Sequence, residues 1–254
     1  MDWNNNTLKR YMEAGLAALI VLTLGLAGAT GVLSPRAAES EQTEAAVEED
    51  STKAGEENEN KDAATNPDTE ETQETIADGQ YPIMGNSDVT VQEMVDYFNA
   101  SGEVYPAEEL SEGGADSIET FCQMYYDEAT AEGVRPEVAF AQTMKETGFL
   151  QYGGDASIEQ FNFAGLGTTG NGVPGNSYPD VQTGIRAQIQ HLKAYATSDS
   201  LNQECVDDRY EYVKKGSAPY VQWLGQQENP EGLGWATGDN YGYDIVGMIE
   251  DMME

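Results

Sequence analysis

The sequence predicts a mainly α domain with a small loop or β lobe, an α+β arrangement, over residues 81–254. Three observations support this prediction. Apolar residues there recur at helical spacing, no sustained period-two alternation is present, and glycine-rich stretches interrupt the helices in the middle of the domain. An apolar run and an acidic stretch precede the domain, so we divide residues 1–80 into a tail (1–11), a membrane segment (12–34) and a linker (35–80).

The apolar run at residues 14–33 is about 20 residues long, the length that crosses a bilayer as a helix. Lys9 and Arg10 precede it and only Arg36 follows closely, so the positive-inside rule places the tail in the cytoplasm. A cleaved signal peptide is the alternative, but its apolar core is typically about 7–15 residues. We therefore expect a single-pass anchor in the cell membrane with an extracellular domain, rather than a secreted one.

The linker is strongly acidic: residues 36–80 hold 15 acidic and three basic side chains and no aromatic one. Such a composition buries too little apolar surface to offset chain entropy, so we expect a disordered tether. The whole chain has a formal net charge of −34, which argues against nucleic acid as a partner.

Metal and disulfide chemistry have little support in the sequence. Two cysteines, Cys122 and Cys205, are too few for a disulfide framework. They could pair outside the cell, but we favour buried thiols. No cluster of cysteine and histidine has the spacing of a zinc site, so we expect no metal and no cofactor.

The first two predicted helices carry one apolar stripe each and begin at a capping pair. Residues 87–88 (Ser-Asp) precede one and residues 116–117 (Asp-Ser) the other. The stripes consist of Val91, Met94, Val95 and Phe98 in the first helix, and Ile118, Phe121, Cys122, Tyr125, Tyr126 and Ala129 in the second.

A third helix should begin at Pro136 and end at Gly148, because proline suits a first turn and glycine follows a last turn. Glu146 then lies at the negative end of the helix dipole, which should raise its pKa. A carboxyl group that keeps its proton near neutrality is what a general acid needs. A solvated surface glutamate is the ordinary interpretation of such a residue.

Residues 152–177 are rich in glycine, too broken for a long helix, and suited to a binding loop or a short hairpin. A helix over residues 180–196 follows, in which we interpret His191 as structural rather than catalytic. Two short helices are expected within residues 207–225. The last helix begins near Asn240, with Tyr241 on its apolar stripe.

Four blocks in this order resemble the bacterial glucosaminidases of glycoside hydrolase family 73 type. These cell-wall hydrolases are also catalogued as mannosyl-glycoprotein endo-β-N-acetylglucosaminidases. The blocks are AFAQTMKETG at residues 139–148, FNFAGLG at 161–167, SYPDVQTGIR at 177–186 and WATGDNY at 235–241.

The resemblance implies a lysozyme-like fold, with a helical lobe facing a small lobe across a cleft. It implies that Glu146 acts as general acid on the β-1,4 bond after N-acetylglucosamine in peptidoglycan glycan strands. It also implies that Tyr241 positions the reacting sugar and that Asn162 and Gly165 shape the floor of the cleft. We add Tyr178, Trp223 and Trp235 as candidates for sugar stacking, because aromatic faces suit the apolar faces of sugars.

The second catalytic group is open. Glycosidases normally use two carboxylates, and Asp180 is our best candidate, ahead of Asp155 and Asp239. The acetamido group of the substrate could act instead. Alternatives for the whole domain are a muramidase or lytic transglycosylase that uses the same glutamate, and a non-catalytic scaffold that binds the wall.

Overall fold

The structure is a computed structural model that describes residues 79–254. The predicted tail (1–11), the membrane segment (12–34) and the linker (35–80) up to residue 78 lie outside the described residues and stay predictions. Within residues 79–254, no helix is both long and apolar enough to cross a membrane.

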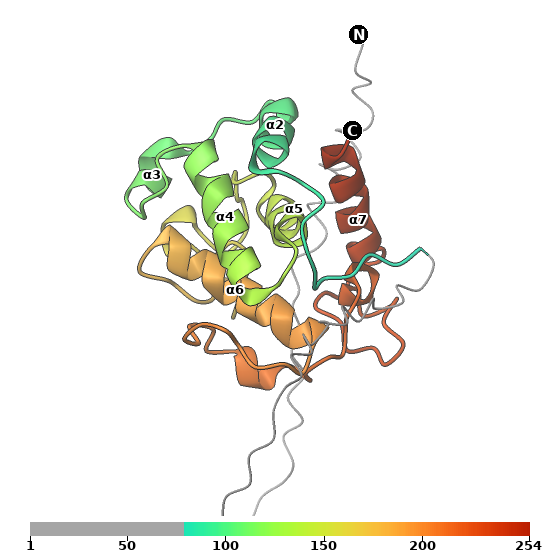
Figure 1. The fold of residues 1–254 in the computed structure, drawn as a ribbon. Helices are drawn as coiled ribbons and strands as arrows, with labels where there is room; N and C mark the ends of the chain where they lie inside the picture. The colour runs from blue at the N-terminus through green and yellow to red at the C-terminus, as the bar shows by residue number, and fades with distance from the viewer. Residues whose placement is uncertain (1–78) are drawn as a thin grey trace, which may run out of the picture. The chain divides into compact units, whose positions relative to one another are not determined.

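Helix α5, Pro136–Thr147, lies at the centre of the described part, where ten of its twelve residues are buried. It contacts α4 (Ile118–Glu132), α6 (Val181–Ala196) and α7 (Tyr241–Met252). Figure 1 shows α5 between α4 and α7. A helix covered on several sides has to pair its buried polar side chains inside the protein.

The predicted ends of the central helices are confirmed. Pro136 occupies the first turn of α5, and Gly148 ends the helix in the left-handed region, with φ 58°. Ser117 caps α4 by accepting a hydrogen bond from the Thr120 N–H, and Asp180 caps α6 through the Thr183 N–H. These signals act within one turn of the chain, which is why the sequence reveals them.

The predicted cap of the first helix is wrong. Helix α2, Val91–Ser101, begins at Thr90, whose side chain forms a capping box with Glu93. Ser87 instead donates a hydrogen bond to a carboxylate oxygen of the buried Glu137. Helix α3, Ala107–Ser111, was not predicted, because five residues are too few for an apolar period to emerge.

The small lobe consists of loops. The two short helices expected within residues 207–225 are the 3₁₀ turns η2, Tyr210–Tyr212, and η3, Val221–Leu224. A third 3₁₀ turn, η1 (Ile158–Gln160), lies in the glycine-rich stretch. The predicted hairpin there is reduced to an isolated bridge between Gly170 and Val173. Residues 79–254 contain isolated bridges but no extended β-strand.

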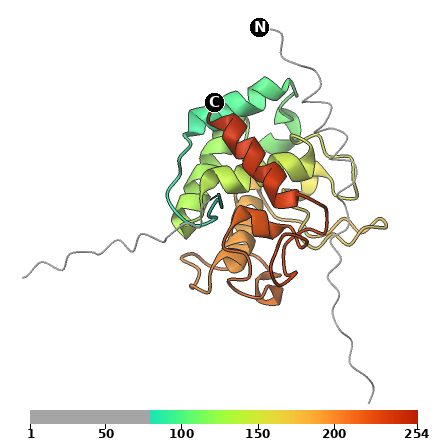
Figure 2. The same cartoon turned by 90° about the vertical axis from the view of Figure 1, so that its right-hand side faces the viewer.

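Helix α7 runs across the front of the domain in Figure 2, with the loops between α6 and α7 below it. Gly242, in the first turn of α7, permits a close approach to η3. A Cβ atom there would lie 2.1 Å from the Val221 carbonyl oxygen. A glycine is therefore needed where this helix begins.

The core is aromatic and joins the helices around α5. Its largest fully buried rings include Phe98, Phe121, Tyr125, Phe140 and Phe163. Both thiols are free; Cys122 is buried as expected, whereas Cys205 is exposed, so the prediction of two buried thiols is half wrong. The mainly helical arrangement with a loop lobe is consistent with the lysozyme-like fold that the resemblance implied.

Candidate active site

Glu146 lies in the last turn of α5 and is partly exposed. The chain then turns through the left-handed region at Gly148, Phe149 and Leu150, with φ of 58°, 56° and 65°. Residues other than glycine avoid this region at a cost of roughly 1–2 kcal/mol each. Thr147 supports the turn, since its hydroxyl accepts a hydrogen bond from the Leu150 N–H at 2.9 Å. The turn therefore stores strain beside Glu146, as functional sites often do.

Tyr241, the first residue of α7, donates a hydrogen bond from its hydroxyl to Oε1 of Glu146. Lys145 Nζ lies 5.6 Å from the centre of the Tyr241 ring and forms an ion pair with Asp244 at 2.8 Å. These contacts hold the start of α7 against the end of α5. The two residues that the resemblance singled out for catalysis are thus brought together.

A buried chain of hydrogen bonds fixes the direction in which Tyr241 donates. The Gln188 amide group donates to the Ala139 carbonyl oxygen at 3.0 Å and to Gln142 Oε1 at 2.9 Å. The carbonyl oxygen can only accept, so it sets the orientation of both amides. Gln142 Nε2 consequently donates to the Tyr241 oxygen at 3.0 Å, and the single hydroxyl proton points to Glu146.

The far end of this chain is also paired. Oε1 of Gln188 accepts hydrogen bonds within 2.9 Å from the hydroxyls of Tyr125 and Thr143. Tyr125, Gln142, Thr143 and Gln188 are all 0% exposed. A buried network without an unpaired member is rigid, so it holds Tyr241 in one orientation.

Burial raises the pKa of Glu146 from its ordinary 4.5 to about 7, although the Tyr241 hydrogen bond and the Lys145 charge act in the opposite direction. The direction agrees with the sequence prediction, but the main cause is burial rather than the helix dipole. Burial, and then the Glu146 charge, raise the pKa of Tyr241 well above its ordinary value. Tyr241 therefore stays protonated near neutral pH.

Asn162 is a buried residue of the 161–167 loop, and its side-chain amide forms hydrogen bonds with the backbone there. Its amide nitrogen donates to the carbonyl oxygens of Leu166 and Asn176, and its oxygen accepts from the Leu166 N–H at 2.9 Å. The start of α6 supports the same loop: a Cβ on Gly184 would lie 1.8 Å from the Phe161 carbonyl oxygen. Asn162 thus shapes the loop and has no free donor for a ligand.

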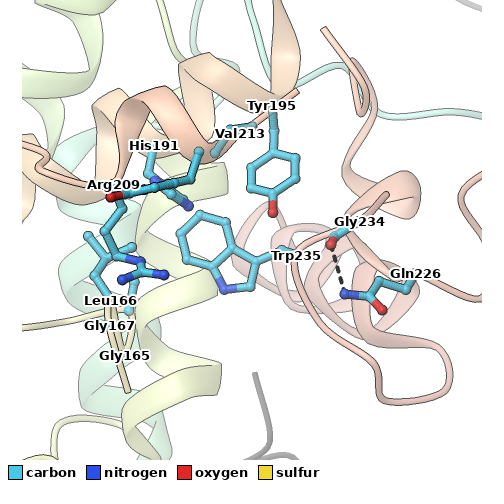
Figure 3. A pocket seen from close by; sticks show the side chains of 12 residues that line it. Gly165, Leu166, Gly167, His191, Tyr195, Arg209, Val213, Gln226, Gly234 and Trp235 are labelled. Atoms are coloured by element: carbon cyan, nitrogen blue, oxygen red, sulfur yellow. Dashed lines mark hydrogen bonds between the residues drawn. The ribbon is translucent and has the colours of Figure 1, made fainter. Parts of the chain in front are cut away.

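A pocket lies beside this loop (Figure 3). Its lining consists of Ala164, Gly165, Leu166, Gly167, His191, Tyr195, Arg209, Tyr212, Val213, Gln226, Gly234 and Trp235. The predicted residues Gly165 and Trp235 meet here, whereas Tyr178 and Trp223 do not line it. Trp235 is only 4% exposed, and its ring lies edge-to-face with His191 at 4.8 Å.

His191 is held by contacts with buried residues, which fits its interpretation as a structural residue. Its Nδ1 lies 2.7 Å from Oδ2 of the buried Asp207, and its ring packs against Tyr195 as well as Trp235. The contact with Trp235 joins α6 to the loop that carries this tryptophan, whereas the contact with Tyr195 lies within α6. The histidine thus orients aromatic side chains.

Asp180, the predicted second carboxylate, uses Oδ1 to cap α6 through the Thr183 N–H at 2.7 Å. Asp180 is the capping residue of α6 and remains only a prediction as a catalytic group. Within residues 79–254, no three histidine, cysteine or acidic side chains come together as a potential metal site.

Sequence reasoning missed Gln142, Gln188 and Arg209. The two glutamines lie on helices with apolar stripes and look like ordinary polar positions until the helices are packed together. Arg209 is one of several charges in a loop. The only signal for Gln142 was its place on the helix of Glu146, one turn earlier.

Comparison with known proteins places the chain in a family. The sequence profile of a family described as glucosaminidase, mannosyl-glycoprotein endo-beta-N-acetylglucosaminidase, matches residues 122–254. An uncharacterized protein of Borreliella burgdorferi is 44% identical over 104 residues, which cover 41% of this chain and 51% of that protein. The matched region thus spans about half the length of that curated relative. No solved structure matches.

The family match includes Glu146, the 161–167 loop and Tyr241, the residues around which the candidate site is built. It covers more than half of the chain. The chain therefore belongs to the glucosaminidase family described as mannosyl-glycoprotein endo-beta-N-acetylglucosaminidase.

Proposed function

We propose that the domain is a peptidoglycan hydrolase that cleaves the β-1,4 glycosidic bond after N-acetylglucosamine, with Glu146 as general acid. The family supports a glycoside hydrolase that acts on peptidoglycan. One observation carries the residue assignment: the pKa of Glu146 is raised by burial to about 7, so much of the carboxyl keeps its proton near neutral pH.

The hydrogen-bond chain favours one oxygen as the proton donor. Oε1 of Glu146 accepts the Tyr241 hydroxyl, and no described residue donates to Oε2. In the acid form the proton then belongs on Oε2, since Oε1 already serves as an acceptor. Oε2 would protonate the leaving-group oxygen, while Tyr241 holds the carboxyl group in place.

We propose two alternative groups that would assist the attack on the sugar. Asp180 would activate or replace the attacking water if its Oδ2 reaches the sugar, which fits the two-carboxylate scheme of most glycosidases. Alternatively, the acetamido group of the substrate assists. A muramidase would cut the other glycosidic bond with the same acid, and a lytic transglycosylase would leave an anhydro product.

We also propose that Tyr178, Trp223 and Trp235 contact the glycan, with Gly165 allowing its close approach. The predicted N-terminal anchor would hold the domain at the outer face of the cell membrane. If the segment is cleaved instead, the domain would be secreted to the cell wall.

The decisive experiment compares wild-type protein with the Glu146→Gln variant on purified peptidoglycan. We expect reducing-end release to fall by about 10³-fold, because general acid catalysis contributes roughly 10²–10⁴-fold. The Glu250→Gln variant, a change on the exposed side of α7, is the control and should keep full activity. Undiminished release by Glu146→Gln would refute the assignment.

Mass spectrometry of the products identifies the bond. A reducing-end N-acetylglucosamine supports the proposal, and a reducing-end N-acetylmuramic acid indicates a muramidase. A 1,6-anhydromuramic acid end indicates a lytic transglycosylase. Wall binding without any product from the wild-type protein would support the scaffold alternative.

A further inference from the structure

Arg209 stands apart from the other basic side chains of the domain. Residues 81–254 hold 29 acidic and seven basic side chains. Six of the seven form ion pairs with carboxylates, and Arg209 has none among the residues that the structure describes. The six pairs are Arg135–Asp88, Lys145–Asp244, Arg186–Glu128, Lys193–Glu132, Lys214–Glu231 and Lys215–Glu211. An unpaired guanidinium in so acidic a domain calls for an explanation.

The carboxylates next to Arg209 in sequence are engaged elsewhere. Asp207 accepts a hydrogen bond from the Arg209 backbone N–H through Oδ1 and pairs with His191 through Oδ2. Oδ1 of Asp208 accepts from Asn176 Nδ2 at 2.6 Å. These contacts fix the backbone at Arg209, and neither carboxylate forms an ion pair with its guanidinium group.

The side chain lines the pocket described above, on the side of residues 165–167 (Figure 3). The carbon of its guanidinium lies 5.5 Å from the centre of the Tyr212 ring. Tyr195 and Trp235 form further aromatic walls of the same pocket. A guanidinium group that packs its face against an aromatic ring keeps its N–H groups, which point outward in its own plane, free to bind an oxygen ligand.

Tyr195 and Trp235, which line the pocket, link it to the candidate catalytic pair. Burial, Glu146 and, to a smaller extent, the hydroxyl of Tyr195 raise the pKa of Tyr241. Tyr195, which lines the pocket, is thus near enough to Tyr241 to influence its pKa. Trp235 begins the block of residues 235–241 that ends at Tyr241. A sugar in the pocket would therefore be near the sugar whose bond is cut.

We propose that this pocket binds a carboxylate of the muramic acid unit, with Arg209 as the specificity-determining residue. The inference rests on the proposed function, since it names the part of peptidoglycan that the site selects. Arginine pairs with carboxylates through two parallel hydrogen bonds, which fixes orientation. Elsewhere the acidic surface repels anions, so Arg209, the one lysine or arginine within residues 79–254 that has no ion pair, sets the register of the strand.

Two parts of peptidoglycan carry such a carboxylate. One is the lactyl group of a muramic acid without a peptide, and the other is the stem peptide. Three substrates separate them: peptide-bearing strands, amidase-treated strands with free lactyl carboxylates, and amidase-treated strands whose carboxylates are methyl esters. The last substrate keeps the sugars and removes the charge.

The experiment measures kcat/KM for wild-type protein, Arg209→Gln and the control Lys214→Gln on these three substrates. Lys214 is an ion-paired lysine whose side chain is 59% exposed. We expect Arg209→Gln to lose about 10-fold, mainly in KM, on charged strands and to equal the wild type on the ester. Loss on the amidase-treated strands identifies the lactyl carboxylate. Loss confined to peptide-bearing strands identifies the stem.

An equal loss on all three substrates, or no loss on any, would overturn the inference. Thermal unfolding of Arg209→Gln shows whether an equal loss reflects misfolding. A wild-type protein without turnover would refute the proposed function instead. Binding of the charged and esterified disaccharide, GlcNAc-MurNAc, to Glu146→Gln protein with and without the Arg209 change then still tests the pocket.

Discussion

Glu132 and Glu146 are alike in sequence and opposite in structure. Glu132 is the last residue of α4, which Gly133 ends with φ 75°, and Glu146 lies in the last turn of α5, before Gly148 with φ 58°. Glu132 is 1% exposed and accepts hydrogen bonds from Lys193 Nζ and from the N–H groups of Asn202 and Gln203. Among described residues, only Tyr241 donates to Glu146.

The number of hydrogen-bond donors distinguishes Glu132 from Glu146. Glu128 shows the same effect: burial would raise its pKa, but hydrogen bonds from Arg186, Gln182 and Gln203 outweigh burial and lower it. For Glu146 burial prevails, and its pKa rises to about 7. A glutamate at a helix end is therefore no signal by itself. The elements that pack against it decide whether it stays charged.

Removal of Glu132 should have the largest effect on stability. A Glu132→Met variant leaves the Lys193 ammonium, 3% exposed, without its counter-charge. We expect the free energy of unfolding to fall by about 3–5 kcal/mol. Urea denaturation measures this loss, and the double variant with Lys193→Met should recover part of it. If Glu132→Met kept its stability and lost its activity, Glu132 would belong to the chemistry and the contrast would fail.

Removal of the Tyr241 hydroxyl, the one donor to Glu146 among the described residues, should alter the pH profile of hydrolysis. The Tyr241 hydroxyl lowers the pKa of Glu146, so Tyr241→Phe should raise that pKa further above 7. The decline of kcat with rising pH would move to higher pH, because the acid form persists longer. The rate at lower pH should fall about 10–100-fold, since the carboxyl loses its orientation.

The pH profile of peptidoglycan hydrolysis between pH 5 and 9 tests this expectation. Tyr243→Phe, on the exposed side of α7 with 55% of the residue accessible, is the matched control. A decline that stays in place, or moves to lower pH, would show that Tyr241 does not act through Glu146.

The smallest effect should be a gain of stability. Glu146 binds its proton more tightly in the folded protein than in the unfolded chain. Its contribution to the stability of the folded protein is therefore fully present below pH 4.5 and is lost as pH rises through about 7. Glu146→Gln removes this titration. The free energy of unfolding of the variant minus that of the wild type should therefore be about 2 kcal/mol larger at pH 8 than at pH 4.

Thermal unfolding of both proteins at the two pH values measures this gain. Glu250→Gln, at an exposed position, should show no such change with pH. An identical pH dependence of Glu146→Gln and wild type would mean that burial does not perturb Glu146, and the contrast with Glu132 would lose its physical basis.

Local signals accounted for most of the helical framework. Caps, Pro136, Gly148 and apolar stripes predicted α4, α5, α6 and α7 close to their observed bounds. The errors concern features without a local signal. Ser87 was misassigned as a cap because its partner, Glu137, is distant in sequence. The predicted short hairpin does not form. The 161–177 loops are instead joined by hydrogen bonds of the Asn162 side chain and by close backbone approaches at glycines, rather than by paired strands.

The sequence by itself determined the helix that carries Glu146, the blocks of the family and the acidic character of the chain. Helix caps, apolar periodicity and motifs involve residues that are close together in the chain, so they can be recognised from the sequence alone. Only the tertiary structure decided that Tyr241 reaches Glu146 and that Gln142 and Gln188 fix the direction of the Tyr241 proton. It also decided that Arg209 lines a pocket without an ion pair to any described residue. These properties depend on burial and on partners from separate helices and loops, and burial of a charge becomes costly or useful only when those elements meet.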